Sequence, residues 1–204
     1  MPEKSIDPIV MGARFVEDVQ TVISREKDPA AFGVVTVGSI SAGTVGNIIP
    51  DEATLRGTIR TLDDGVRAKI IEGINRTANA VAAMSGAPAP DVKIGDTAYS
   101  VINDPALTAK TAAVLKEAMG DNVKEMPRPI SGSEDFSEFT RAGVPGVYFG
   151  IGGMDPKVIA EDAKKGVPVP VNHSPQFTVV PEPTIKTGVE AMTLTVMNVM
   201  PPKA

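Results

Sequence analysis

The residues from Ala53 to Leu62, ATLRGTIRTL, most constrain what this chain can fold into, because apolar and polar positions alternate from Ala53 to Arg60. Successive side chains of a β-strand point to opposite faces. Ala53, Leu55, Gly57 and Ile59 therefore share one face, and the polar side chains of Thr54, Arg56, Thr58 and Arg60 share the other. The pattern predicts a strand with one buried and one wet face, as is typical of antiparallel sheets.

The segments around this strand extend the prediction to an α/β unit over residues 1–100. Asp7-Pro8 opens a helix that runs from Ile9 to Ser24, since Asp is a favoured N-cap and Pro a favoured first residue. A β-branched run predicts a strand at 33–41, Asp63 and Asp64 cap a helix that Gly86 ends, and 91–97 reads as a further strand. The order matches a ferredoxin-like βαββαβ motif with its first strand missing.

Residues 101–204 predict a second α/β part, with the boundary near 99–103. Asp104-Pro105 opens a helix through Met119, and Val144–Ile151 is a continuous apolar run of the kind found in strands buried on both faces. The remaining predicted elements are a strand at 123–126, a helix at 133–141, an irregular loop at 152–171 and a helix at 182–200. This half resembles part of a larger α/β layer.

Composition excludes several classes of function. A net charge of −5 without a basic stripe argues against binding to nucleic acid or anionic lipid, which needs clustered Lys and Arg. The absence of cysteine excludes disulfides and thiolate-bound zinc. No apolar run approaches the roughly 20 residues that span a bilayer, and no apolar segment of a secretory signal follows Met1. We therefore expect a cytoplasmic protein.

His173, the single histidine, lies in the loop segment VNHSP and is a candidate metal ligand or general base. Lone histidines are more often structural or solvated. Gly132 and Ser133, followed by Glu134 and Asp135, can expose backbone amides at a helix start, although an ordinary capped helix start is the simpler explanation.

Asn47 and Arg60 are candidate substrate-binding residues. Asn47 precedes a turn and can hydrogen-bond a substrate, and Arg60 on the polar face of its strand can bind a carboxylate with two hydrogen bonds. Ordinary turn chemistry and an ordinary surface arginine remain the alternatives. A triad of Ser133, His173 and Asp135 is formally open, but the chain lacks the G-x-S-x-G motif that would support it.

Seven short motifs stand in order along the chain: IDPI (6–9), QTVISRE (20–26), GNIIPD (46–51), GTIR (57–60), GSEDF (132–136), VPG (144–146) and NHSPQF (172–177). In this order and spacing they resemble a family of metal-dependent amidohydrolases that includes hippurate hydrolase, auxin-conjugate hydrolases and N-acyl-amino-acid deacylases. This family belongs to the wider zinc aminoacylase–carboxypeptidase superfamily.

The resemblance implies a partial lid domain over 1–100 that mediates dimerisation, followed by the C-terminal part of a zinc-peptidase-like catalytic domain over 101–204. It implies that His173 is the last ligand of a divalent metal (zinc, manganese or cobalt). Asn47, Arg60 and the segment from Gly132 to Asp135 would hold an N-acyl amino acid. The remaining metal ligands and the general base would come from an N-terminal half that this chain lacks.

Three hypotheses follow. The first is a hydrolase fragment that is inactive alone and binds metal weakly, because one imidazole does not build a dinuclear zinc site. The second is a non-catalytic interaction module that pairs through the lid edge left bare by the missing strand. The third is a split enzyme whose N-terminal half is a separate polypeptide.

Overall fold

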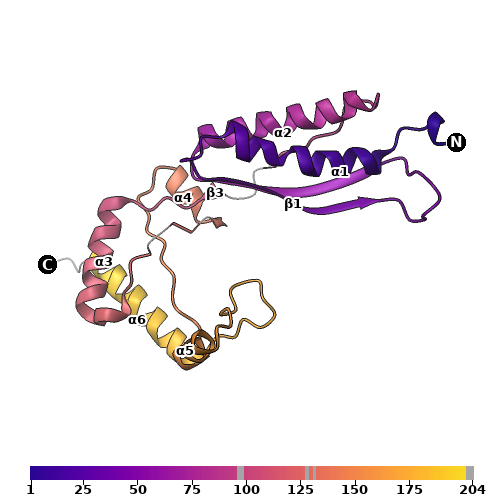
Figure 1. Ribbon diagram of the computed structural model, residues 1–204. Coiled ribbons are helices and arrows are strands. Elements are labelled where there is room, and N and C mark those ends of the chain that lie inside the picture. The colour runs from indigo at the N-terminus through magenta and orange to yellow at the C-terminus, as the bar shows by residue number, and fades with distance from the viewer. Residues whose placement is uncertain (96–98, 127–128, 131, 201–204) are drawn as a thin grey trace. The chain divides into compact units, whose positions relative to one another are not determined.

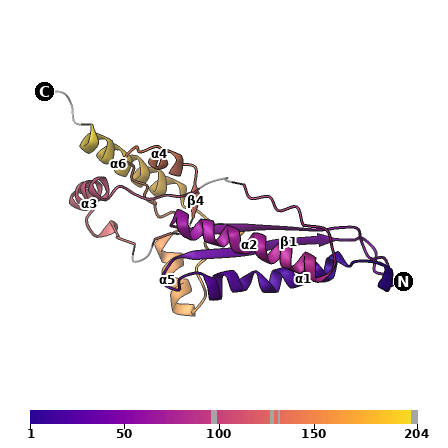
Figure 2. The same cartoon turned by 90° about the horizontal axis from the view of Figure 1, so that it is seen from above.

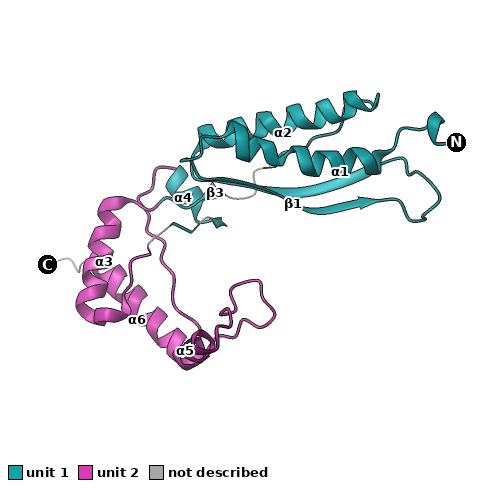
Figure 3. Cartoon of the chain, viewed as in Figure 1, with its two compact units in different colours: residues 1–102, 129–141 teal, residues 103–128, 142–204 magenta. Residues whose placement is uncertain are grey.

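The computed structural model describes residues 1–95, 99–126, 129–130 and 132–200, which fall into two units (Figure 3). Unit 1 contains residues 1–102 and 129–141, and unit 2 contains residues 103–128 and 142–204. The chain is a mixed α/β protein. Among the described helices, none has the length and apolar character needed to cross a bilayer.

Unit 1 consists of two long helices on one face of a two-stranded sheet (Figures 1 and 2). Its helices and strands are η1 (Pro2–Lys4), α1 (Pro8–Asp18), the π-helix η2 (Val22–Glu26), β1 (Gly33–Ala42), β2 (Ala53–Thr61), α2 (Asp64–Met84), β3 (Tyr99–Ser100), β4 (Ser133–Glu134) and α4 (Ser137–Arg141). The predicted helices and strands that begin at Asp7, Gly33, Ala53 and Asp63 are confirmed.

The two helix starts form for the reasons that the sequence indicates. The Asp7 carboxylate accepts hydrogen bonds from the amides of Ile9 and Val10, and the Asp63 carboxylate accepts one from Val66. These bonds satisfy amides that have no partner inside the helix. Gly86, at φ 67°, lies just beyond the end of α2 in the left-handed region that glycine adopts without strain.

Strands β1 and β2 pair antiparallel, from Gly33 opposite Thr61 to Ala42 opposite Ala53, with a bulge between Val37 and Ser39. The apolar face of this sheet lies against the helices, where Val19, Val22, Ile70 and Ile74 form a buried core. A hydrogen bond from Arg76 to Glu26 ties α2 to η2 at the surface, and this bond and the carboxylate charge raise the pKa of Arg76.

Unit 2 contains α3 (Pro105–Met119), η3 (Gly120–Asn122), α5 (Pro156–Lys165) and α6 (Pro181–Val199). Helices α3 and α6 pack together, burying Leu115 and Ala191. The Asn103 side chain holds the 144–151 segment by exchanging two hydrogen bonds of 2.9 Å with the backbone of Tyr148.

Several predicted elements are wrong. Residues 91–95 and 123–126 form no strand, and the rest of the predicted 91–97 strand lies outside the described residues. The apolar run 144–151 forms no strand either, because a strand needs a hydrogen-bonded neighbour and the described part of unit 2 offers only helices and loops. The predicted loop 152–171 contains α5. The predicted helix 133–141 is a short strand followed by a five-residue helix.

Candidate functional site

Arg60 lies on the face of the β1–β2 sheet that the helices leave uncovered. Its side chain is exposed, and its cross-strand partner is Val34. Ile59 and Thr61, its neighbours in β2, are partly buried on the helix side, as the alternation in the sequence predicts. Arg60 can therefore bind a ligand only from the open side of the sheet.

Asn47 lies in the connection between β1 and β2, in an exposed turn. It is at the opposite end of the hairpin from Arg60, because β2 runs from Ala53 to Thr61. Arg60 lies seven positions after Ala53, which corresponds to roughly 24 Å of extended strand. The structure therefore does not bring Asn47 and Arg60 together within one chain.

The segment from Gly132 to Asp135 is held in unit 1 by a small sheet. Ser133 and Glu134 form β4 and pair antiparallel with Ser100 and Tyr99 of β3. Gly132 and Ser133 are partly buried, whereas Glu134 and Asp135 are exposed. Helix α4 begins only at Ser137. Gly132 and Ser133 therefore do not stand at a helix start, and the expected helix-terminal amides are not at these positions.

Ser137, two residues beyond this segment, is a residue that the sequence did not single out. Its side chain is fully buried, and its Oγ accepts a hydrogen bond of 3.2 Å from the Tyr99 amide. Its carbonyl accepts a further hydrogen bond from the Thr140 hydroxyl. A buried hydroxyl with such partners is expected to hold the turn after Asp135 in place.

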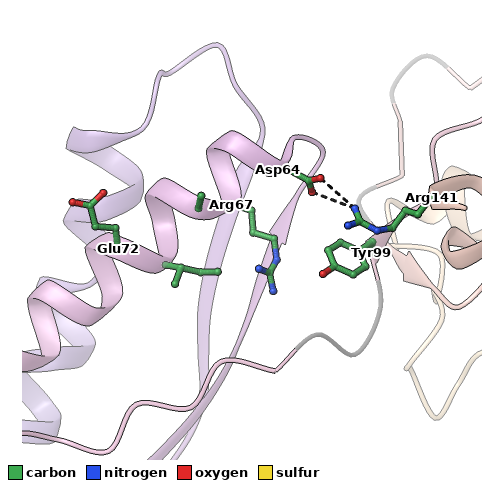
Figure 4. Close-up of a pocket in the computed structure, with 7 residues that line it drawn as sticks. Asp64, Arg67, Glu72, Tyr99 and Arg141 are labelled. Carbon is green, nitrogen blue, oxygen red and sulfur yellow. Dashed lines mark hydrogen bonds and ion pairs between the residues drawn. The ribbon is translucent and has the colours of Figure 1, made fainter. Parts of the chain in front are cut away.

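A second set of contacts joins α4 to the start of α2. Figure 4 shows the Arg141 guanidinium over the Tyr99 ring, 3.6 Å from its centroid, and directed at the Asp64 carboxylate, 3.3 Å away. Arg67 lies 5.5 Å from the same ring. Cations over an aromatic face are attracted by its quadrupole. These residues border two neighbouring openings of about 420 and 440 Å³.

The larger opening joins the predicted Gly132–Asp135 segment to the end of β2. Ser133 and Thr61 both line it, and the Ser100 hydroxyl donates a hydrogen bond of 2.6 Å to the Thr61 carbonyl. The opening lies on the helix side of the sheet, since Ile59 and Arg67 also line it. Ser133 therefore shares a cavity with the strand that carries Arg60, but Arg60 itself faces the other side.

His173 lies in unit 2, exposed in a turn closed by a hydrogen bond from the Ser174 amide to the Val171 carbonyl. Its φ of 71° is the only positive value for a non-glycine residue in the described chain. Histidine tolerates this left-handed conformation better than most residues, yet the conformation is still strained. Backbone strain of this kind is typical of functional positions, so His173 remains a candidate metal ligand.

A complete metal centre does not fit the residues that the structure describes. Nowhere in those ranges do three or more His, Cys, Asp or Glu side chains gather as metal ligands would. The chain has one histidine and no cysteine, and hydrolytic zinc sites need three protein ligands. His173 can therefore contribute one ligand, and no reaction step through a metal follows from this chain alone.

Residues 7–198 match the family described as Peptidase family M20/M25/M40. Thermostable carboxypeptidase 2 of Saccharolobus solfataricus is 34% identical over 194 residues, which are 95% of this chain and 46% of that protein. N-acetyldiaminopimelate deacetylase of Streptococcus thermophilus is 36% identical over 152 residues, 74% of this chain and 40% of that protein.

Two solved structures resemble this one. A protein of methicillin-resistant Staphylococcus aureus assigned as an aminohydrolase has a TM-score of 0.71 and 30% identity, covering 97% of this chain and 48% of its own. A dinuclear metal-binding peptidase of family M20 from Bacillus subtilis has a TM-score of 0.59 and 24% identity, at the same coverage, and so supports the fold alone. The chain thus spans less than half the length of these relatives.

Proposed function

The chain belongs to peptidase family M20/M25/M40, and from this premise we propose that it is the C-terminal part of a metal-dependent amidohydrolase acting on N-acyl amino acids or related amides. Two of its relatives are named as a carboxypeptidase and a deacetylase, which both cleave C–N amide bonds. The chain spans 46% and 40% of these two proteins.

The chain does not hydrolyse amides by itself under this proposal. The observation that carries this part is the single histidine, His173, in a sequence without cysteine. Among the described side chains, no group of three potential ligands accompanies it. His173 would supply one ligand of a centre for zinc, manganese or cobalt whose other ligands and general base come from another polypeptide segment.

Residues 1–100 would form part of a ferredoxin-like lid and dimerisation domain, and residues 101–204 the C-terminal part of the catalytic domain. The helix–strand–strand–helix order of α1, β1, β2 and α2 supports the first assignment. An exposed apolar stripe on α6, made of Ile185, Val189, Met192 and Val196, supports the second. A helix with one stripe that packs on α3 and a second, exposed apolar stripe is expected to contact a further segment.

Arg60 would bind the carboxylate of the amino acid, and Gly132, Ser133, Glu134 and Asp135 would line the pocket of the complete enzyme. The exposed position of Arg60 on the open sheet face supports the first role. Asn47 would contact a different part of the substrate or a substrate held by another chain, because it lies at the far end of the hairpin.

The test is an amidase assay on the purified chain. Hippurate and N-acetyl amino acids are incubated with the chain and zinc, manganese or cobalt, with and without a chelator. We expect no chelator-sensitive hydrolysis. A polypeptide corresponding to the N-terminal half of a full-length relative is then added, and hydrolysis that needs both polypeptides would support a split enzyme. Turnover by the chain alone, abolished by the chelator, would contradict the proposal.

A second candidate function is an interaction module, and the β1–β2 sheet favours it. Each of these strands pairs with only one neighbour in the described chain, so each presents an open edge. Open strand edges bind further strands readily. Light scattering of the purified chain tests this candidate. A stable homodimer is expected if the edge pairs with a second copy, and a monomer at every concentration would count against it.

A further inference from the structure

The open face of the β1–β2 sheet carries almost only hydroxyl groups and two arginines. Its positions follow from the register and from the alternation of β2, whose other face packs on the helices. The members of this face are Val34, Thr36, Ser39 and Ser41 of β1 and Thr54, Arg56, Thr58 and Arg60 of β2. No carboxylate stands among them, and the nearest in sequence, Asp51 and Glu52, precede β2.

Arg56 and Arg60 stand four residues apart on this face, with Thr58 between them. Four strand residues correspond to about 13 Å between the two backbones. Both side chains are exposed on the same face, and an extended arginine side chain is long enough for the two guanidinium groups to reach the two ends of one ligand. Thr58 lies directly opposite Thr36, and this pair places two hydroxyl groups between the arginines.

We propose that this face binds N-acyl amino acids that carry a second carboxylate. Arg60 binds one carboxylate, Arg56 binds the other, and the Thr36 and Thr58 hydroxyls hydrogen-bond the amide attached to the carbon chain that joins the two carboxylates. The inference rests on the role of Arg60 proposed above and adds Arg56 as the residue that selects a dianionic substrate. Arg56 is close enough to Arg60 to contact the second carboxylate. Asn47 is too far from Arg60 for this contact, because it lies beyond the other end of β2.

The charge pattern explains why a second carboxylate is selected. A guanidinium offers a planar fork of donors that matches a carboxylate, and such charge-assisted bonds are stronger than neutral ones. A neutral amide in the same place satisfies fewer donors of Arg56. Because the face is exposed, salt screens the attraction, and we expect a preference of about three- to tenfold at low ionic strength.

The test compares two ligands of equal size, N-acetyl-L-glutamate and N-acetyl-L-glutamine. They are titrated into the full chain while the arginine side-chain signals are followed by NMR. We expect the glutamate compound to shift the signals of both Arg56 and Arg60 and to bind about three- to tenfold more tightly. The glutamine compound shifts mainly Arg60. Raising the salt concentration narrows the difference.

Three variants identify the residue responsible. Arg56→Gln removes the charge and is expected to reduce the glutamate affinity to the glutamine level, and Arg56→Lys restores part of the preference. Arg14→Gln is the matched control. Arg14 is exposed on α1, on the other side of the sheet, and its replacement by glutamine removes the same charge as Arg56→Gln.

Each remaining outcome counts against one specific claim. Equal affinities for the two ligands, or a preference that survives Arg56→Gln, overturn the inference and leave Arg60 in its proposed role. Glutarate bound as tightly as N-acetylglutamate would show a general anion surface without amide recognition, which also overturns it. If neither N-acyl compound perturbs Arg60, the proposed substrate role of Arg60 fails and the inference fails with it.

Discussion

Replacing Gly73 by alanine tests the packing of unit 1, because two opposite effects meet at this residue. Gly73 lies in α2, where its surface touches Val22 of η2. A Cβ at this position would stand 2.6 and 2.9 Å from the two methyl groups of Val22. Val22 is fully buried in the core and β-branched, so its side chain cannot rotate away easily.

The overlap is expected to outweigh the gain in helix propensity. Alanine in place of glycine inside a helix contributes about 1 kcal/mol. Forcing an extra methyl group into a packed core costs typically 1–3 kcal/mol, and contact with two methyl groups at once puts this site at about 2–3 kcal/mol. We therefore expect Gly73→Ala to lower the free energy of unfolding by about 1–2 kcal/mol.

A double mutant gives the decisive comparison. In a Val22→Ala chain both methyl groups are gone, so the same Gly73→Ala change should be neutral or stabilising by up to about 1 kcal/mol. Urea unfolding followed by circular dichroism measures all four chains. If Gly73→Ala stabilises the chain that keeps Val22, or destabilises both backgrounds equally, the close approach of α2 and η2 is not as described.

Three further substitutions test other parts of the structure. Gly57→Ala should destabilise the β1–β2 sheet by about 3 kcal/mol or prevent folding, because its Cβ would overlap the Thr36 carbonyl; loss of the unfolding transition or a low urea midpoint would show it. Gly188→Ala on α6 should stabilise unit 2 by about 0.5–1 kcal/mol, since nothing lies within 4 Å of its Cβ, and a lower melting temperature would refute this. His173→Gly should leave stability within about 1 kcal/mol of the parent, because glycine relieves the positive φ, whereas His173→Val should cost about 1–2 kcal/mol more.

The sequence predicts the elements of unit 1 whose stability is local or pairwise. Strand β2 alternates cleanly and finds its partner in β1, only a short connection away. The helix starts at Asp7 and Asp63 depend on hydrogen bonds within a few residues. Such elements can be predicted because the residues that stabilise them are neighbours in the sequence.

The errors in unit 2 have a different origin. Residues 144–151 are apolar enough for a buried strand, but a strand forms only beside another strand, and that requirement is not visible in the run itself. Helix α5 was missed, although the sequence contains the signals that predict it. Asp155-Pro156 repeats the start signal of the helices at Asp7 and Asp104, the Asp155 carboxylate caps it, and Gly166 ends it at φ 66°.

The sequence predicted which residues belong to the candidate site, but it did not predict how they are arranged in space. The sequence singles out Arg60 and Ser133, and the structure puts Ser133 in a cavity beside the end of β2 while Arg60 faces the other side of the sheet. Arg141 and Tyr99, whose contact joins α4 to β3, gave no signal because these residues are 42 positions apart in the sequence. Arg56 was visible in the alternation of β2, but only the register shows the hydroxyl pair between it and Arg60.

Zinc binding by the purified chain tests the central claim most directly. Equilibrium dialysis of the 204-residue chain and of its His173→Gln variant measures the zinc bound per chain. We expect weak binding by the parent that the substitution abolishes, because a single imidazole holds zinc poorly. Tight binding of one or two zinc ions per chain, retained in the His173→Gln variant, would mean that this polypeptide builds a metal centre of its own and would contradict the account.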